Sequence, residues 1–425
     1  MFRRDPYRVF IAFSGLSTFA FTLVATVNLV YQIEIVRLSP FQLLMVGSAL
    51  ELTCLVLQVP SGVLADAWSR RATVVLGVGL TGLGFIVEGA VPSFPSVLLA
   101  QVVWGSGASL VDGADSAWLV DEIGDERAAG AFLRSSQVSS ALLLLAIPAS
   151  AGLAAVRLNL PVLLGGAMYV LLAGYLWAAM TERGDRSRGG RDHPVVEEDD
   201  LPPLTPRRMR GVVSGAARVV RSQPVVLGIV VASLFAGAAS EGLDRLAYLH
   251  LIRDVGLPRL GFPPVLWFGV AGMGGAVIAI AVGEVLRRRD LAREGASPAV
   301  IVVLAATVAA GTLAFAAAGG FAVAIAFLWL IRAARRCWGP VENAWINRRI
   351  DSSVRATVLS INGLADAMGQ IVAGPLIGLI ASLVSVRAGI SASAAFLVPA
   401  VAVFCALLVR ERRRRPAGRV GDMVR

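Results

Sequence analysis

Ionisable side chains interrupt several long apolar runs of this chain, and two of them are carboxylates near the middle of a run. Glu51 lies within the run at 41–64, and Asp366 lies within the run at 357–381. A charge at the centre of a bilayer costs roughly 2.5 to 3.5 kcal/mol on insertion scales, so each carboxylate needs a partner, a water-filled cavity or a proton. Burial favours the neutral form, and such a group can release its proton when the cavity opens to water. Two interpretations stay open: proton carrying, and a hydrogen-bonded or ion-paired role in helix packing.

Three arginines form a stripe in the apolar run at 321–346. Arg332, Arg335 and Arg336 follow the i, i+3, i+4 spacing that places side chains on one face of a helix. Guanidinium groups bind carboxylates and phosphates through paired hydrogen bonds, so the stripe favours an anionic solute. In the alternative interpretation, Arg335 and Arg336 pair with Glu342 or with carboxylates of the apolar run at 97–120, the fourth along the chain, and only Arg332 meets a substrate.

A polar cluster closes the apolar run at 224–250. Glu241 and Arg245 form an i, i+4 pair in the favourable order, and Asp244 and His250 lie beside them. We expect this cluster to be an extracellular gate or a satisfied ion cluster. Proton sensing by the histidine is the alternative.

The ten residues GVLADAWSRR at 62–71 stand between two apolar runs. Their spacing, G-x-x-x-D-x-x-x-R-R, combines a small residue for close helix approach, a carboxylate at a helix end and a terminal arginine pair. The stretch resembles the signature loop between the second and third helices of major facilitator superfamily transporters, and the match falls on Gly62, Asp66, Arg70 and Arg71. This resemblance implies a cytoplasmic gating turn, a small-molecule substrate and transport by alternating access.

Two further carboxylates lie in the inner part of the fourth run. Asp112 and Asp115 share one helix face at i, i+3, and their depth suits a network with Asp66, Arg70 or Arg134. Such a network would hold the cytoplasmic side closed. We therefore expect an inner gate here, with a conformational role.

Apolar runs of membrane-spanning length predict an all-α integral membrane protein, since a helix crosses the bilayer core in roughly 20 residues. We expect helices at about 8–30, 41–64, 72–92, 97–120, 131–155, 161–180, 224–250, 263–286, 299–318, 321–346, 357–381 and 386–409. These twelve helices fall into two pseudo-symmetric bundles of six. The expected division is an N-terminal bundle at 1–180, a cytoplasmic linker at 181–223, a C-terminal bundle at 224–410 and a basic cytoplasmic tail at 411–425.

Arginine placement predicts the orientation. All 39 basic residues are arginine, which is typical of a GC-rich bacterial genome, and they gather in alternate loops, the linker and both ends of the chain. Cytoplasmic loops carry the excess of positive charge, so both termini should face the cytoplasm. The expected location is the cytoplasmic membrane of a bacterium, and lipid headgroups, not nucleic acid, account for the net charge of +10.

An internal repeat supports the two bundles. The chain reads DSAWLVDEIGDERAAGAFLRSS around Trp118 and ENAWINRRIDSSVRATVLSING around Trp345, at equivalent positions in the two halves. Asp115 aligns with Glu342. Parallel repeats of this kind place a substrate site between the halves near the midplane.

Glycine and proline in the eleventh run give the resemblance a subtype. The stretch GQIVAGPLIG at 369–378 is similar to the glycine-proline motif that drug:proton antiporters carry in helix 5, although the fifth run here has only IPASAG. Gln101 stands where those antiporters usually have a helix 4 arginine. The leading hypothesis is proton-coupled efflux of a small amphipathic compound, with Trp104, Phe21 and Trp267 as candidate cavity walls.

Other functions are less well supported by composition. Two histidines and three isolated cysteines offer no clustered nucleophile, metal or cofactor set, which argues against a membrane-embedded enzyme. A sensor would normally add a folded soluble domain, and the linker is too polar for one. The transport alternative is uptake or facilitated movement of a small organic anion bound by Arg332. We expect a monomer.

Overall fold

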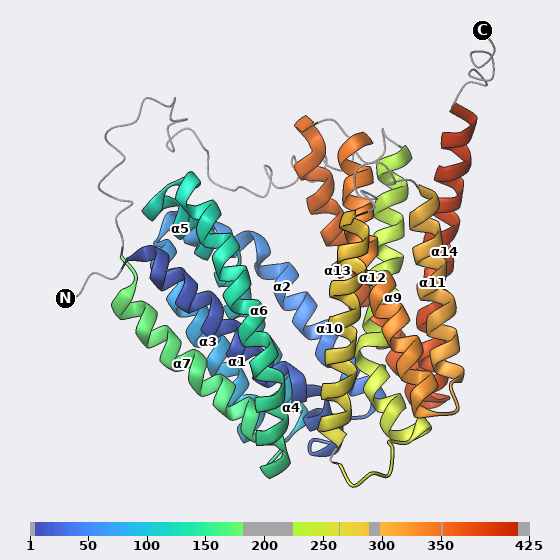
Figure 1. Cartoon of the computed structure of the whole chain (residues 1–425), viewed down its shortest axis with the longest axis horizontal. Coiled ribbons are helices and arrows are strands. Elements are labelled where there is room, and N and C mark those ends of the chain that lie inside the picture. The colour runs from blue at the N-terminus through green and yellow to red at the C-terminus, as the bar shows by residue number, and fades with distance from the viewer. Residues whose placement is uncertain (1–4, 182–223, 263, 289–297, 350–351, 415–425) are drawn as a thin grey trace. The chain divides into compact units, whose positions relative to one another are not determined.

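The chain folds into long helices (Figure 1), and the computed structural model describes residues 5–181, 224–262, 264–288, 298–349 and 352–414, which contain no strand. The helices are α1 (Pro6–Glu34), α2 (Pro40–Ala67), α3 (Arg70–Ala90), α4 (Phe94–Val111), α5 (Ala114–Ile123), α6 (Asp125–Val156), α7 (Leu160–Ala179), α9 (Pro224–His250), the π-helical extension η2 (Leu251–Val255), α10 (Pro264–Arg288), α11 (Pro298–Ala317), α12 (Phe321–Arg349), α13 (Ser352–Leu383) and α14 (Val386–Arg414).

Serine caps begin several of these helices. Ser39 forms a capping box with Gln42, in which each side chain bonds the backbone nitrogen of the other residue at 3.2 and 2.9 Å. Ser69 accepts from the Ala72 backbone nitrogen at 3.1 Å and so separates α2 from α3. These caps satisfy donors that a helix start leaves open, and they fix helix ends that hydropathy alone places only approximately.

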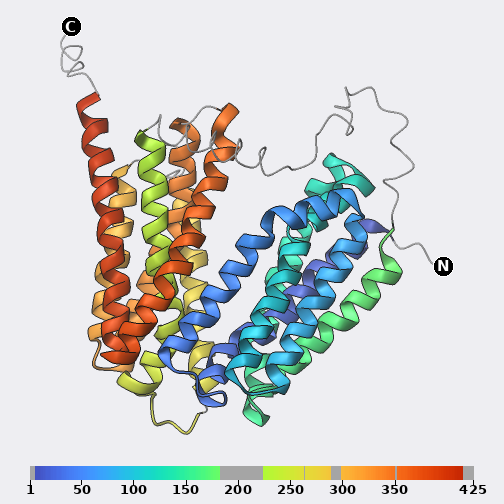
Figure 2. The ribbon, with the colours of Figure 1, turned by 180° about the vertical axis from the view of Figure 1, so that it is seen from behind.

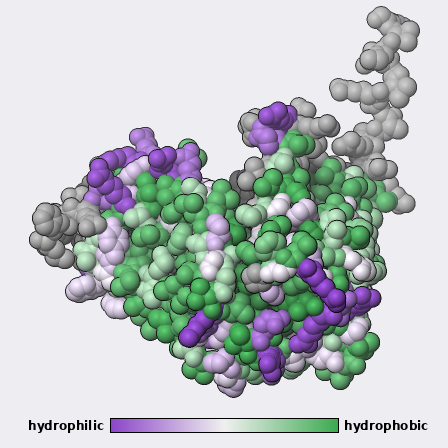
Figure 3. Space-filling model, turned by 60° about the horizontal axis from the view of Figure 1, so that its bottom comes forward, coloured by the Kyte–Doolittle hydropathy of each residue, from purple (hydrophilic) through white to green (hydrophobic). Residues whose placement is uncertain are grey.

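Most of the helices have the length and composition of membrane spans, and α12, which contains Arg332, Arg335 and Arg336, is not among them. Ten segments of the described chain are long and apolar enough to cross a membrane, and the apolar part of α10 is shorter. Figure 3 shows one face of the molecule, which is mostly hydrophobic with hydrophilic residues gathered in patches. The predicted class, an all-helical membrane protein, is confirmed.

The fourth predicted helix differs from expectation because it is broken near its end. Gly113 has φ +80° and stops α4 at Val111, and Gly124 has φ +79° and separates α5 from α6. Glycine occupies this region of φ at no steric cost. The expected span at 97–120 is therefore two helices, and the expected span at 131–155 begins earlier, at Asp125.

Glycines bring α3 close to its neighbours in the N-terminal half, which Figure 2 shows from behind. A Cβ at Gly77 would lie 2.6 Å from the Gly107 carbonyl oxygen of α4, and a Cβ at Gly82 would lie 2.7 Å from the Gly166 carbonyl oxygen of α7. Close backbone contact of this kind is typical of small residues in membrane helices. It buries one whole face of α3, including Glu88.

The C-terminal helices pack by similar contacts. Helix α11 packs against α12 and α14, and α14, in red, lies at the edge of this group in Figures 1 and 2. A Cβ at Gly237 of α9 would run into the Asp366 carbonyl oxygen of α13. A Cβ at Gly369 of α13 would likewise run into the Leu234 carbonyl oxygen of α9. At this crossing each helix places a glycine, Gly237 or Gly369, against the backbone of the other helix.

The chain divides into two compact units by its internal contacts. One unit comprises Met1–Pro202 with Arg245–Met273, and the other comprises Pro203–Asp244 with Gly274–Arg425. The boundaries at 180 and 224 stay predictions, as do the linker and the tail. Residues 182–223 and 415–425 lie outside the described residues, and so does His193.

Candidate functional site

The motif at 62–71 spans a helix end and a helix start. Gly62 and Asp66 lie in the last turns of α2, and Arg70 and Arg71 open α3. A Cβ at Gly62 would meet no described atom within 4 Å. The side chain of Asp66 lies outside the described part of the structure.

The two motif arginines connect α3 to other helices of the N-terminal half. Arg70 Nη1 donates to the Ala117 carbonyl oxygen at 3.3 Å and forms an ion pair with Asp121, both on α5. Arg71 Nη2 donates to the Trp177 carbonyl oxygen near the end of α7. The start of α3 is thus attached to both α5 and α7.

A second set of bonds attaches α5 to the end of α7. Trp118 Nε1 donates to the Thr181 carbonyl oxygen at 2.8 Å, and Thr181 Oγ1 donates to Glu122 Oε2 at 2.7 Å. Sequence reasoning missed Asp121 and Glu122 as partners, because hydropathy places them in a loop beyond a helix that the structure breaks at Gly113.

Two of the three residues of the predicted inner gate, Asp115 and Arg134, bond to residues near them in the sequence. Asp112 is exposed at the end of α4, and Asp115 accepts from the Ser116 backbone nitrogen and hydroxyl at 2.6 and 3.2 Å. Arg134 is exposed on α6 and donates to Gln137 Oε1 at 3.1 Å. Their gating role stays a prediction.

Glu88 of α3 is a fully buried carboxylate in the N-terminal half, with an exposure of 0%. Gln32 Nε2 of α1 donates to its Oε1 at 2.7 Å, and Gln101 Nε2 of α4 donates to its Oε2 at 3.2 Å. Asn28 of α1 interacts with the same carboxylate, and Tyr31 donates its hydroxyl to the Glu88 backbone carbonyl at 2.9 Å. The sequence places Glu88 in the outer part of the third apolar run but assigns it no role; a polar residue within each of three apolar runs was the signal that could have identified the cluster.

An aromatic surface adjoins this carboxylate. Trp104 Nε1 donates to Gln101 Oε1 at 3.0 Å, so the indole is one hydrogen bond removed from the amide that binds Glu88. The Trp104 ring lies 5.4 Å from the Phe85 ring and 6.2 Å from the Phe21 ring, centroid to centroid. Phe21 is 42% exposed, which suits contact with an apolar ligand.

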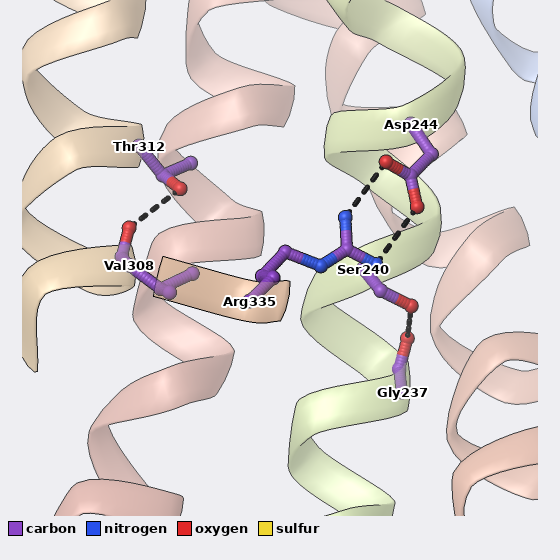
Figure 4. A network of polar contacts seen from close by, with 6 residues as sticks. All are labelled: Gly237, Ser240, Asp244, Val308, Thr312 and Arg335. Carbon is purple, nitrogen blue, oxygen red and sulfur yellow. Dashed lines mark hydrogen bonds and ion pairs between the residues drawn. The ribbon is translucent and has the colours of Figure 1, made fainter. Parts of the chain in front are cut away.

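Arg335 of α12 and Asp244 of α9 form a paired hydrogen-bond contact in the C-terminal half. Figure 4 shows the guanidinium directed at the carboxylate, with Nη1–Oδ1 and Nη2–Oδ2 distances of 2.7 and 3.0 Å. Two more carboxylates, Asp366 and Glu241, lie within electrostatic range of this arginine. The structure therefore brings together residues that the sequence assigned to three separate sites.

The remaining predicted residues of α9 have different surroundings. Glu241 is 4% exposed and His250 is fully buried. His250 Nδ1 lies 2.8 Å from Asp254 Oδ2 of η2, a partner that sequence analysis did not select. Arg245 is half-buried.

Three other candidates are half-buried. Glu51 lies on α2, and the Asp366 carboxylate of α13 accepts from Gln370 Nε2 at 2.8 Å. Arg332 belongs to α12, and its side chain lies beside α10: a Cβ at Gly275 of α10 would be 3.5 Å from the Arg332 Cδ. Among the described residues, no group of three or more histidine, cysteine or acidic side chains could hold a metal ion.

Long apolar helices with ionisable groups inside them define a polytopic membrane protein with the construction of a solute transporter. A family model for the Major Facilitator Superfamily matches residues 9–334. The chain belongs to this family, whose members are transporters and not enzymes, and it is a multi-pass membrane protein.

Individual comparisons agree with this family. The chain is 21% identical over 393 residues to the uncharacterised MFS-type transporter YxaM of Bacillus subtilis (strain 168), covering 92% of this chain and 93% of the relative. It resembles the crystal structure of the nucleoside transporter NupG with a TM-score of 0.71 and 12% identity, over 95% of this chain and 99% of that one.

Two further solved structures share the fold. A bacterial homologue of the human lysosomal transporter Spinster, inward-facing and occupied, has a TM-score of 0.69 and 15% identity, over 96% of this chain and 98% of that one. The peptide transporter POT in complex with sulfate has a TM-score of 0.70 and 13% identity, over 96% and 94%. At these identities the likeness shows the fold alone.

Proposed function

We propose that this transporter works by alternating access and exports small amphipathic compounds in exchange for protons. The observation that carries the proposal is the aromatic surface of Phe21 and Trp104, which packs on the buried Phe85 ring and is connected through Gln101 to the carboxylate of Glu88. Aromatic side chains offer large apolar contact area, and a nearby carboxylate favours a ligand that also carries a positive charge.

The proton-coupling part rests on carboxylates within the helices. Glu51 and Asp366 are the candidates from sequence, and Asp366 lies near Arg335 and Asp244 in the C-terminal half. A carboxylate that alternates between a closed and an open environment exchanges its proton with one side of the membrane at a time. The coupled solute would then move against its own gradient.

The gating part rests on the start of α3. The proposed inner turn consists of Gly62, Asp66, Arg70 and Arg71. The proposed inner gate adds Asp112, Asp115 and Arg134. The Arg70–Asp121 pair is 33% and 44% exposed, so its contribution is about 0.2 to 1 kcal/mol. That is too small to decide folding, and large enough to shift an equilibrium between two conformations several-fold.

The setting of this activity is also part of the proposal. The protein acts as a monomer in a bacterial cytoplasmic membrane, with both termini and the linker at 181–223 in the cytoplasm. Two six-helix bundles, 1–180 and 224–410, move about a shared substrate site near the midplane.

Everted membrane vesicles containing a pH-sensitive dye test the coupling. We expect lipophilic cations and other amphipathic drugs to cause proton movement that vesicles without the transporter lack. Asp66→Asn should strongly reduce the rate while the protein stays in the membrane, and Glu126→Gln, at an exposed carboxylate on α6, is the matched control. Transport of such compounds without any proton movement would contradict the coupling, and an unchanged rate in Asp66→Asn would contradict the gate.

The second candidate is uptake or facilitated movement of a small organic anion. Arg332 favours it, because a half-buried guanidinium on a membrane helix suits an anionic ligand. Counterflow of radiolabelled organic acids, with Arg332→Ala as the comparison, separates the two candidates. Pairing of Arg335 with Asp244 favours the first, since that guanidinium is already engaged by a carboxylate.

A further inference from the structure

The surroundings of Glu88 differ from those of a carboxylate held only for packing. The side chain is fully buried, and the groups that donate to it directly are neutral amides, Gln32 from α1 and Gln101 from α4, with Asn28 from α1 close by. A buried structural carboxylate is usually bound by a cation that stays beside it, because an ionised group is costly to desolvate. Neutral amide donors stabilise the carboxylate anion less strongly than a cation does, so the protonated, neutral form of Glu88 is also accessible.

The amides can also satisfy the protonated acid. Gln32 Oε1 and Asn28 Oδ1 are buried and have no hydrogen-bond partner in the described structure. A protonated Glu88 would be a donor that needs an acceptor, and an amide presents its oxygen when its side chain rotates by half a turn. The same cluster can therefore hold the carboxylate in one state and the carboxylic acid in the other. Unpartnered buried oxygens in native proteins call for such an explanation.

Charged groups near Glu88 are few. Helices α4 and α7, which make the most extensive contacts with α3, carry no charged side chain, and neither does α3 itself between its opening arginines and Glu88. Helices α2 and α5 also contact α3 and carry carboxylates: Glu51 lies on α2, and Asp121 of α5 pairs with Arg70 at the end of α3 opposite to Glu88. Helix α1 has Arg8 in its first turn and the exposed Glu34 as its last residue. Glu88 interacts electrostatically with the charge of Arg245, a residue of α9. Arg245 itself belongs to the same compact unit as Glu88.

Trp104 connects the carboxylate to the aromatic surface. Its indole donates to Gln101 Oε1, and the Gln101 amide nitrogen donates to Glu88. A change in the charge of Glu88 changes what Gln101 must donate or accept, and so changes the bond to Trp104. A ligand against Phe21 and Trp104 acts on the same chain of bonds in the opposite direction.

We propose that Glu88, held by Asn28, Gln32 and Gln101, is a reversible proton-binding site, and that the Gln101–Trp104 bond links its protonation to occupancy of the aromatic surface. The inference rests on the proposed function for its role in transport. The proton adds to and leaves a carboxylate oxygen of Glu88, with water on one side of the membrane as donor and acceptor. A sodium ion fits less well, because the amide nitrogens, not the oxygens, point at the carboxylate.

Protonation can be measured on the purified protein without any substrate. We expect pH-difference infrared spectra to contain the carbonyl band of a protonated carboxylic acid that disappears in Glu88→Gln and persists in Glu34→Gln, a carboxylate on the exposed end of α1. We expect a pH-dependent part of the tryptophan fluorescence to be lost in both Glu88→Gln and Trp104→Phe. Glutamine is nearly isosteric with protonated glutamate, and an unchanged thermal-unfolding temperature checks that the variant is folded.

Transport gives the second measurement. In proteoliposomes, Glu88→Gln should lose substrate-driven proton movement, and Glu34→Gln, at an exposed carboxylate on the same membrane protein, should keep it. An infrared band that persists in Glu88→Gln, or a fluorescence change that follows Na⁺ at constant pH, would overturn the inference. Drug–proton exchange without titration of Glu88 would refute this inference alone, and titration of Glu88 without exchange would refute the proposed function alone.

Discussion

Arg335 and Asp244 illustrate how a charge is tolerated within a membrane helix. The paired hydrogen bonds use both terminal nitrogens of the guanidinium, a planar arrangement that lysine could not make. Glu241 and Asp366 add negative charge near the same arginine. If Asp244 is removed, the guanidinium keeps part of this compensation, and if Arg335 is removed, several carboxylates face one another.

A double-mutant cycle measures the pair. We expect Asp244→Ala and Arg335→Ala each to lower thermal stability in detergent, and the double variant to lose less than the sum. The side chains are 54% and 34% exposed, so the coupling should be about 0.5 to 1 kcal/mol. Arg336→Ala, at the exposed neighbouring arginine, is the control. Additive losses would show that the pair contributes no interaction of its own.

At the scale of the elements, the crossing of α9 and α13 depends on glycine. A Cβ at Gly369 would lie 2.7 Å from the Ala238 backbone nitrogen and closer still to the Leu234 carbonyl oxygen, whereas a Cβ at Gly363 on the same helix would meet no described atom within 4 Å. Backbone cannot yield as a flexible side chain can, so the helices would have to separate.

Alanine at these two positions tests that difference. Gly369→Ala should destabilise the protein by about 1 to 3 kcal/mol or lower its folded yield, because the crossing is overpacked. Gly363→Ala should be neutral or slightly stabilising, since alanine is the better helix former by about 1 kcal/mol. The measurement is thermal unfolding of both variants in the same detergent. Equal stability of the two would mean that α9 and α13 do not cross as closely as described.

Hydropathy predicts most elements well because each membrane helix is a local property of its own residues. The helix expected at 224–250 ends where α9 ends, and the helix at 386–409 begins where α14 begins. The break at Gly113 depends on a positive φ, which composition does not reveal. The pairing of Arg335 with Asp244, 91 residues away, depends on how α9 and α12 meet. Hydropathy selects the polar residues within spans, but their partners come only from helix packing.

For the whole molecule, the internal repeat relates the two halves without making them identical. Trp118 and Trp345, the equivalent tryptophans, are both buried, at 5% and 3% exposure. The first copy forms the separate helix α5 between two glycines, and the second copy continues along α12. The two copies therefore share a buried tryptophan and differ in where their helices end.

Orientation in the membrane is the property on which any directional transport depends, and α6 provides a direct test of it. This helix has 32 residues, about 48 Å, which exceeds the roughly 30 Å hydrocarbon core, so its two ends must lie on opposite sides. Both Asp125, at its start, and Arg157, just beyond its end, are exposed. We expect the first to face the cytoplasm, as the distribution of arginines predicts.

Single cysteines at these positions, in a chain whose three native cysteines are replaced, measure the orientation. Asp125→Cys in intact cells should react only with a membrane-permeant maleimide, and Arg157→Cys should also react with an impermeant one. Everted vesicles should reverse the pattern, which controls for differences in reactivity. Impermeant labelling of Asp125→Cys in intact cells would place the Arg70–Asp121 contact outside, because α5 and the start of α6 are separated by one glycine. The inner turn could not then be a cytoplasmic gate, and the direction of the proposed export would have to be reversed with it.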